Sequence, residues 1–287
     1  MTVEHLAETH RFSGANGHRL CGDLIGPANG TFVVLTHGGG QTRHSWGSTA
    51  RTLAKEGYRV LSLDLRGHGD SDWSAERHYS IQHHAEDIAA IIRAVTAGPV
   101  ILVGASLGGL ASLLVTGTLE PEKVLALILV DVAINVRPDG AKRITDFMHR
   151  HVKGFKTLEE AADAISDYRP EQPRREDLSG LRKNLRVKDG HYFWHWDPAM
   201  LRRPLEDGVP IMPREELEEA AKNVTVPTLV VRGLRSDVID EGSEDALREF
   251  IPHLETTSVR DAGHMVVGDN NAVFEERIID FLKRAVA

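Results

Sequence analysis

Short apolar runs alternate along the chain with segments whose apolar residues recur at helical spacing. The runs are typical of strands buried on both faces of a sheet, and they lie at 31–35, 59–63, 99–103 and 124–130. Helical segments are predicted over 45–56 and 81–95, and Ser80 stands at the N-cap position of the second. This alternation predicts a mainly parallel sheet with helices on both sides.

The two ends of the chain add further strands. Segments 11–13 and 19–24 flank the turn signal Ala15-Asn16-Gly17, which predicts a hairpin. Beyond residue 226, strands are predicted at 227–232 and 255–259, each followed by a helical segment. The carboxyl ends of parallel strands meet at one edge of a sheet, and we expect the active site there.

The pattern changes over residues 135–223. Helical stretches replace the glycine-punctuated strands, a proline-rich basic piece spans 169–175, and an aromatic cluster occupies 191–196. This insert is too long for a structureless loop. We therefore predict an α/β core built from 1–134 and 224–287, with 135–223 inserted as a helical cap.

Composition places the protein among soluble globular chains. Of its 287 residues, 41% are apolar and 26% charged, and the net charge of −8 argues against a nucleic-acid surface. The apolar run at 124–130 is far shorter than the roughly 20 residues that span a bilayer. The N-terminus does not resemble a secretory signal, and one cysteine, Cys21, cannot form an internal disulfide. A cytoplasmic location is expected.

The sequence Gly104-Ala105-Ser106-Leu107-Gly108 follows one strand and precedes a helical segment over 107–118. A G-x-S-x-G pattern in this context is typical of a nucleophile elbow, a strained turn that exposes its serine. Glycines two positions either side of the serine avoid a clash where strand and helix crowd together. We take Ser106 as the candidate nucleophile.

A serine nucleophile needs a base, and the base needs an acid that fixes its tautomer. At an elbow the expected chain order is serine, then Asp or Glu, then histidine. Asp237 follows the strand at 227–232 and His264 follows the strand at 255–259, so order and placement both fit. Asp131 also ends a strand and is the alternative acid.

With these residues in view, the chain resembles the α/β-hydrolase superfamily. The resemblance rests on His37-Gly38-Gly39-Gly40, the segment Asp64 to Ser71, the serine elbow, the aspartate after the seventh strand, and Gly263-His264. It implies a mostly parallel eight-stranded sheet with a cap. It also implies that Ser106 attacks, His264 is the base, Asp237 orients it, and backbone N–H groups of Gly39 and Leu107 hold the oxyanion. His37 is expected to support the oxyanion loop.

The resemblance makes a carboxylic ester or lactone of a small molecule the expected substrate. A C–C bond hydrolase of ring-cleavage products and a binding protein without turnover are the alternatives, whereas serine at the elbow disfavours relatives with an aspartate nucleophile. Cap side chains Met148, Trp194, Trp196 and Met212 are candidates for the pocket, although they equally fit a cap core. Arg43 is a candidate to meet a substrate carboxylate.

Fifteen histidines raise the question of a metal site. His83 and His84 are adjacent and His149 and His151 are two apart, so on a helix neither pair faces a common ligand. His191 and His195 have a suitable spacing but lie among aromatic residues. We predict no metal, no cofactor, no nucleic-acid or membrane partner, and leave monomer or dimer open.

Overall fold

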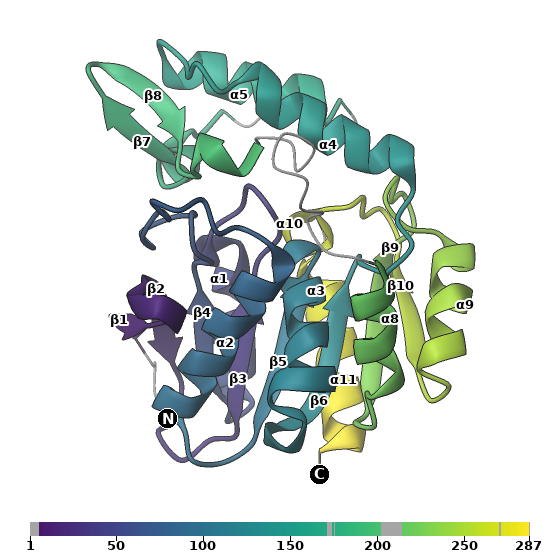
Figure 1. Cartoon of the computed structure of the whole chain (residues 1–287). Helices are drawn as coiled ribbons and strands as arrows, with labels where there is room; N and C mark the ends of the chain where they lie inside the picture. The colour runs from purple at the N-terminus through teal and green to yellow at the C-terminus, as the bar shows by residue number, and fades with distance from the viewer. Residues whose placement is uncertain (1–5, 171–173, 175, 202–213, 270, 287) are drawn as a thin grey trace.

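The computed structural model describes residues 6–170, 174, 176–201, 214–269 and 271–286. Eight strands form one sheet in the order β1-β2-β4-β3-β5-β6-β9-β10, which confirms the predicted fold (Figure 1). In chain order they are β1 (Glu8–Ser13), β2 (Arg19–Ile25), β3 (Phe32–Thr36), β4 (Arg59–Leu63), β5 (Val100–Ala105), β6 (Val124–Val130), β9 (Thr228–Gly233) and β10 (Glu255–Val259). From β4 to β10 every neighbouring pair is parallel, while β1 and β2 form the predicted antiparallel hairpin.

Alternating side chains of the central strands point to the two faces of the sheet. In β3, Phe32 and Val34 join one apolar cluster, whereas Val33 and Leu35 join the other. The first face is covered by α2 (Ile81–Val95), α3 (Leu107–Leu114), α8 (Arg214–Lys222) and α9 (Glu241–Phe250). The second is covered by α1 (Gly47–Lys55), α10 (Val266–Asp269) and α11 (Asn271–Ala285). No helix in the described ranges is long and apolar enough to cross a membrane.

Several local signals in the sequence act as expected. The Ser80 side chain accepts a hydrogen bond from the His83 backbone N–H at the start of α2. Short helical turns complete the core at η1 (Ala15–Gly17), η2 (Arg43–Trp46), η3 (Val115–Leu119) and η4 (Pro121–Lys123).

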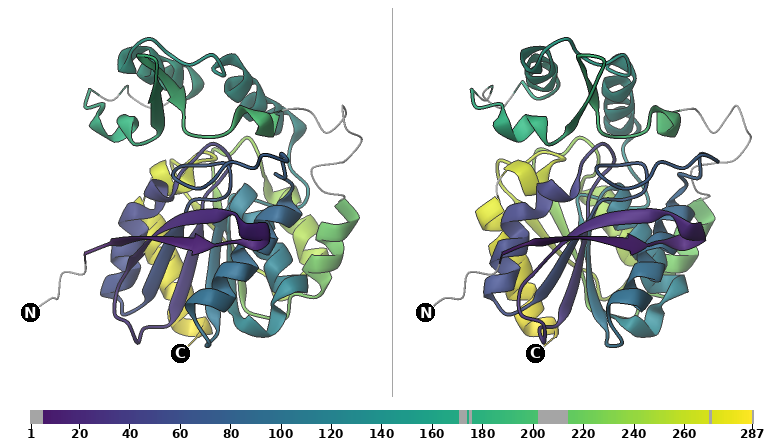
Figure 2. Two further views of the ribbon diagram at one scale, coloured as in Figure 1. Left: turned by 60° about the vertical axis from the view of Figure 1, so that its left-hand side comes forward. Right: turned by 90° about the vertical axis from the view of Figure 1, so that its left-hand side faces the viewer.

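A separate layer lies over the edge at which the parallel strands end (Figures 1 and 2). It contains α4 (Pro138–Arg150), α5 (Leu158–Tyr168), α6 (Ser179–Arg182), β7 (Leu185–Lys188), β8 (His191–Trp194) and η5 (Pro198–Leu201). Its own small core includes Phe155, Ala161, Ala164 and Leu185. We call this layer, residues 135–201, the cap.

The cap differs in two ways from the sequence prediction. Its aromatic cluster contains strand β8, which pairs antiparallel with β7, so the cap is not wholly helical. The predicted boundary at 223 is also too late, because α8 packs on the core. Leu217, Ala220 and Ala221 of α8 are buried with α3 and the sheet, and a Cβ added at Gly117 would lie 2.0 Å from the Ala220 carbonyl oxygen.

Candidate active site

Ser106 lies at the turn between β5 and α3 with φ 46° and ψ −115°. A non-glycine residue in such a conformation costs on the order of 1–3 kcal/mol and persists only where the surroundings enforce it. Here the Ser106 N–H donates to the Val130 carbonyl at 3.2 Å, and the Ser106 carbonyl accepts from Leu110 N–H at 3.0 Å. The predicted elbow is therefore present, with its serine held between sheet and helix.

The flanking glycines are required by close packing. A Cβ at Gly104 would lie 2.5 Å from the Gly108 carbonyl oxygen, and one at Gly108 would lie 2.6 Å from the Thr36 carbonyl oxygen. Both distances are shorter than a real Cβ tolerates, and the atoms it would meet are backbone. The Gly108 N–H also donates to the His37 carbonyl at 3.2 Å. The elbow is thus packed directly against the end of β3.

His264 is hydrogen-bonded to Asp131, not to Asp237. The His264 Nδ1 atom lies 2.7 Å from Asp131 Oδ2, and the Asp131 side chain is 1% exposed. The same carboxylate accepts the Gly233 N–H at 2.9 Å and the Ser236 hydroxyl at 2.5 Å. Asp131 follows β6 directly, beside the serine elbow, and its φ of 47° turns the chain sharply there. Three donors therefore hold this buried carboxylate.

The prediction that Asp237 orients His264 is wrong in this structure. The Asp237 carboxylate is 33% exposed and forms an ion pair with Arg143 of α4, at 3.1 Å. Its backbone carbonyl is packed against Gly140, since a Cβ at Gly140 would lie 2.1 Å from that oxygen. Asp237 thus connects the loop after β9 to the cap, while the neighbouring Ser236 supports Asp131.

The loop after β3 lies against Ser106. A Cβ at Gly38 would be 3.3 Å from Ser106 Cβ. The Gly38 N–H donates to Gln41 Oε1 at 3.0 Å, and the Gly40 N–H donates to His68 Nε2 at 3.1 Å. Between them, the Gly39 N–H has no hydrogen-bond partner among the described residues, and the same holds for the Leu107 N–H at the start of α3. Both candidate oxyanion donors therefore lack a partner within the part of the chain that the structure describes.

Two buried histidines support this loop in their neutral form. His37 donates from Nδ1 to the Gly38 carbonyl at 2.8 Å and accepts the Leu65 N–H at Nε2, as its predicted supporting role requires. Burial lowers the pKa of His37 to about 4 and, together with the neighbouring His37 ring, that of His68 to about 3. Both rings therefore keep one donor and one acceptor nitrogen near neutral pH.

Sequence reasoning missed the roles of His68, Gln41 and Ser236. His68 lies in the motif Asp64 to Ser71, so its position next to a glycine-rich turn was an available signal. Gln41 and Ser236 carry no such signal, because their role depends on which backbone group each meets in the folded chain. Each of the three side chains forms a hydrogen bond with the glycine loop after β3 or with Asp131.

Residues 31–271 match the family model described as the alpha/beta hydrolase fold. The chain belongs to the α/β-hydrolase fold family. This hydrolase is 27% identical over 251 residues to an esterase of Mycobacterium tuberculosis, covering 83% of this chain and 78% of that protein. It is 29% identical over 265 residues to a 3-hydroxybutyrate-oligomer hydrolase of Cupriavidus necator, covering 88% of this chain and 89% of that protein.

Solved structures show the same architecture. A crystal structure of E-2-(acetamidomethylene)succinate hydrolase superimposes with a TM-score of 0.85 at 21% identity, covering 97% of this chain and all of the other. A structure of the M. tuberculosis esterase gives a TM-score of 0.76 at 25% identity, covering 97% of this chain and 92% of the other. At 21% identity the first of these shows the fold alone.

The predicted pocket residues of the hydrolase separate into different groups. A Cβ at Gly40 would lie 3.6 Å from Met148 Cε and 3.9 Å from Trp196 Nε1, so both side chains lie against the glycine loop after β3 from the cap side. Trp194 lies instead within the cap core, with its ring centroid 5.2 Å from that of Phe155. Met212 lies outside the described residues. Two of the four cap candidates are therefore placed over the site.

Arg43 is not available to bind a substrate carboxylate, which corrects the prediction for this residue. Its side chain is 6% exposed and is ion-paired with Asp64, with Asp70 at 2.7 Å and with Asp23 at 3.0 Å. The Asp64 carboxylate also accepts the backbone N–H groups of Arg43 and Asp70. Arg43 therefore fastens the segment after β4 to the start of η2 and the β1–β2 side of the sheet.

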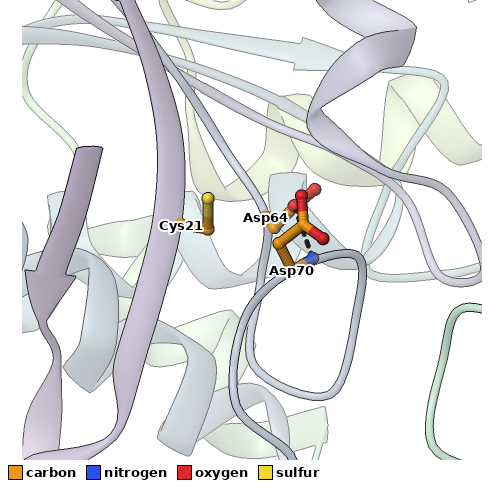
Figure 3. A group of neighbouring side chains, drawn as sticks. All are labelled: Cys21, Asp64 and Asp70. Atoms are coloured by element: carbon orange, nitrogen blue, oxygen red, sulfur yellow. Dashed lines mark hydrogen bonds between the residues drawn. The ribbon is translucent and has the colours of Figure 1, made fainter. Parts of the chain in front are cut away.

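Cys21, Asp64 and Asp70 place possible metal-ligating atoms within 4.8 Å of one another (Figure 3). The two carboxylates are already bonded to the guanidinium of Arg43, which supplies the positive charge that a cation would bring. Burial raises the pKa of the Cys21 thiol, so the sulfur carries its proton near neutral pH. The donor set in Figure 3 therefore fits an arginine rather than a metal ion.

Proposed function

We propose that this hydrolase cleaves a carboxylic ester or lactone of a small molecule through an acyl-enzyme formed on Ser106. The observation that carries the proposal is the 2.7 Å hydrogen bond between His264 and the buried Asp131. Asp131 follows β6, whose last residue pairs with the residue before the strained Ser106. The names of the two relatives, an esterase and a 3-hydroxybutyrate-oligomer hydrolase, support a substrate of this class.

In this proposal the Ser106 hydroxyl attacks the acyl carbon while His264 accepts its proton. Nδ1 of His264 is bonded to Asp131, so Nε2 is the nitrogen that acts as base. The tetrahedral intermediate collapses as the bond from carbon to the leaving oxygen breaks, and His264 returns the proton to that oxygen. Water then repeats the sequence on the acyl-enzyme, releasing the acid and restoring Ser106.

The negative oxygen of the intermediate would be held by the N–H groups of Gly39 and Leu107, which lack partners within the described chain. Removal of one such donor costs about 3 kcal/mol of transition-state stabilisation in a serine hydrolase. A Cβ at Gly39 would meet no heavy atom of the described chain within 4 Å, which leaves room beside the donor. Met148 and Trp196 would form the cap side of the acyl pocket.

The test compares wild type with Ser106→Ala on p-nitrophenyl acetate, longer p-nitrophenyl esters and a set of lactones. We expect the variant to lose turnover by about 10⁴-fold or more, because no other group supplies the attacking oxygen. A small fluorophosphonate should label Ser106, as located by mass spectrometry of the digested protein. Turnover that survives in Ser106→Ala, or a wild type that binds these compounds without cleaving them, would overturn the proposal.

A further inference from the structure

One cap residue touches the backbone of two core loops at once. His195 directly follows β8, and its side chain is nearly inaccessible, at 2% exposure. Its Nδ1 accepts the Gly69 N–H at 2.8 Å, and its Nε2 lies 3.1 Å from the Gly40 carbonyl oxygen. No other histidine of the cap hairpin makes such contacts, since His191 is exposed and its Nδ1 bonds to the Asp189 carbonyl.

The two partners determine the tautomer of His195. A backbone N–H can only donate and a carbonyl can only accept, so Nδ1 is the acceptor and Nε2 carries the proton. Burial, reinforced by the neighbouring rings of His68 and His37, lowers the pKa of His195 well below its ordinary value. The ring is therefore neutral, with both nitrogens used.

Gly40 is next to Gly39, the proposed oxyanion donor, in a run of three glycines that has little conformational preference of its own. Hydrogen bonds with three histidines limit this freedom. His37 binds the Gly38 carbonyl, His68 binds the Gly40 N–H, and His195 binds the Gly40 carbonyl. The first two belong to the core, whereas His195 is supplied by the cap.

Neighbouring contacts hold the same part of the cap on the core. The Asp197 N–H donates to the Gly67 carbonyl at 2.8 Å, and its carboxylate accepts the Tyr79 hydroxyl. The Arg186 guanidinium donates to the Gly69 carbonyl at 2.6 Å. Displacement of the β7–β8 hairpin would break these bonds together with both bonds of His195.

We propose that His195 is a positioning residue through which the docked cap sets the geometry of the oxyanion hole. The inference rests on the proposed function and deepens it, because it makes turnover depend on cap docking even for a substrate too small to contact the cap. A donor displaced by about 1 Å stabilises the transition state much less. Loss of the His195 bonds should therefore lower kcat.

Two substitutions separate the two bonds of His195. In His195→Gln the terminal amide is placed near the position of Nε2 and can donate to the Gly40 carbonyl. In His195→Asn the shorter side chain can accept the Gly69 N–H but does not reach Gly40. We expect His195→Asn to lower kcat on p-nitrophenyl acetate by about 10- to 100-fold, with His195→Gln recovering most of the loss.

The control is His191→Asn, an exposed histidine of the same hairpin, which should keep wild-type kcat. The rate of fluorophosphonate labelling at Ser106 should fall in parallel with kcat, because its phosphoryl oxygen occupies the same donors. Equal kcat in the Asn and Gln variants, or a rise in KM confined to long esters, would overturn the inference. A Ser106→Ala variant that keeps its activity would instead contradict the proposed function itself.

Discussion

Asp131 and Asp237 are two aspartates at the ends of parallel strands, and they differ in what the folded chain does with each. Asp131 follows β6, is buried, and receives hydrogen bonds from Gly233, Ser236 and His264. Asp237 lies four residues beyond β9, is partly exposed, and pairs with Arg143 of the cap. The position of an aspartate after a parallel strand is thus not sufficient to identify the residue that bonds to His264. The end of β9 and the loop after it supply two donors, Gly233 and Ser236, to the Asp131 carboxylate and do not supply the carboxylate that bonds to His264.

The difference also has an energetic side. A buried carboxylate is tolerated only when several donors satisfy it, and the three donors of Asp131 meet that need. An exposed ion pair such as Asp237–Arg143 contributes at most about 1 kcal/mol and needs no such arrangement. The first aspartate is held in a fixed position beside His264, and the second adds a contact between core and cap.

Among changes that test this comparison, the largest expected effect comes from Asp131→Asn. The amide would present an N–H₂ group or a weaker acceptor to His264 Nδ1, so the tautomer needed at Nε2 is lost. We expect kcat on p-nitrophenyl acetate to fall by about 10⁴-fold, with the fold retained. The matched control, Asp237→Asn, should stay within about threefold of wild type, because its partner is a partly exposed arginine. A larger loss in Asp237→Asn than in Asp131→Asn would reverse the assignment.

A second prediction concerns the free energy of unfolding, which should fall as the pH decreases because the core contains buried neutral histidines. His37 and His68 are buried and neutral, with pKa values lowered to about 4 and about 3, whereas the unfolded chain binds a proton at each near pH 6.5. The unfolded state therefore binds more protons below pH 6.5, and the free energy of unfolding falls as pH decreases. His37 alone accounts for a loss of about 3 kcal/mol by pH 4.

A third buried histidine, His84, should contribute to the same pH dependence and can be replaced to measure its share. Its ring is fully buried, neither nitrogen has a partner in the described chain, and burial lowers its pKa well below the ordinary value. His84→Leu should reduce the slope of unfolding free energy against pH below about pH 6.5, by at most about 1.4 kcal/mol per pH unit, which is the slope that one bound proton produces. Urea unfolding at a series of pH values measures the slope. Parallel profiles for wild type and variant would contradict the prediction.

The smallest effect is expected from Ser236→Ala. This change removes the hydroxyl that donates to Asp131 Oδ2 but leaves the Gly233 and His264 bonds in place. The loss of one hydrogen bond to a charged group is worth about 1.5 kcal/mol, which corresponds to roughly a tenfold lower kcat. Ser236→Thr keeps a hydroxyl and should retain most of the activity. Unchanged kcat in Ser236→Ala would show that this donor has no part in positioning Asp131.

Much of the core follows from local patterns in the sequence. The apolar runs, the N-cap residue Ser80 of α2 and the Gly104-to-Gly108 elbow each correspond to a local preference or a local steric need. They can therefore be predicted without knowledge of the fold. The cap is less readable. The aromatic segment 191–194 forms a strand because it pairs with 185–188. Helix α8 packs closely on the core because Gly117 of η3 has no Cβ to meet the Ala220 backbone.

The sequence by itself determined the strand–helix alternation, the serine elbow, the histidine that follows the last strand and the membership of this chain in its fold family. Those features depend on residue type and spacing along the chain. Only the tertiary structure decided that Asp131 meets His264, that three aspartates surround Arg43, and that His195 joins the cap to the oxyanion loop. Each of these depends on where loops distant in sequence come together, because hydrogen bonds and ion pairs form only over a few ångströms.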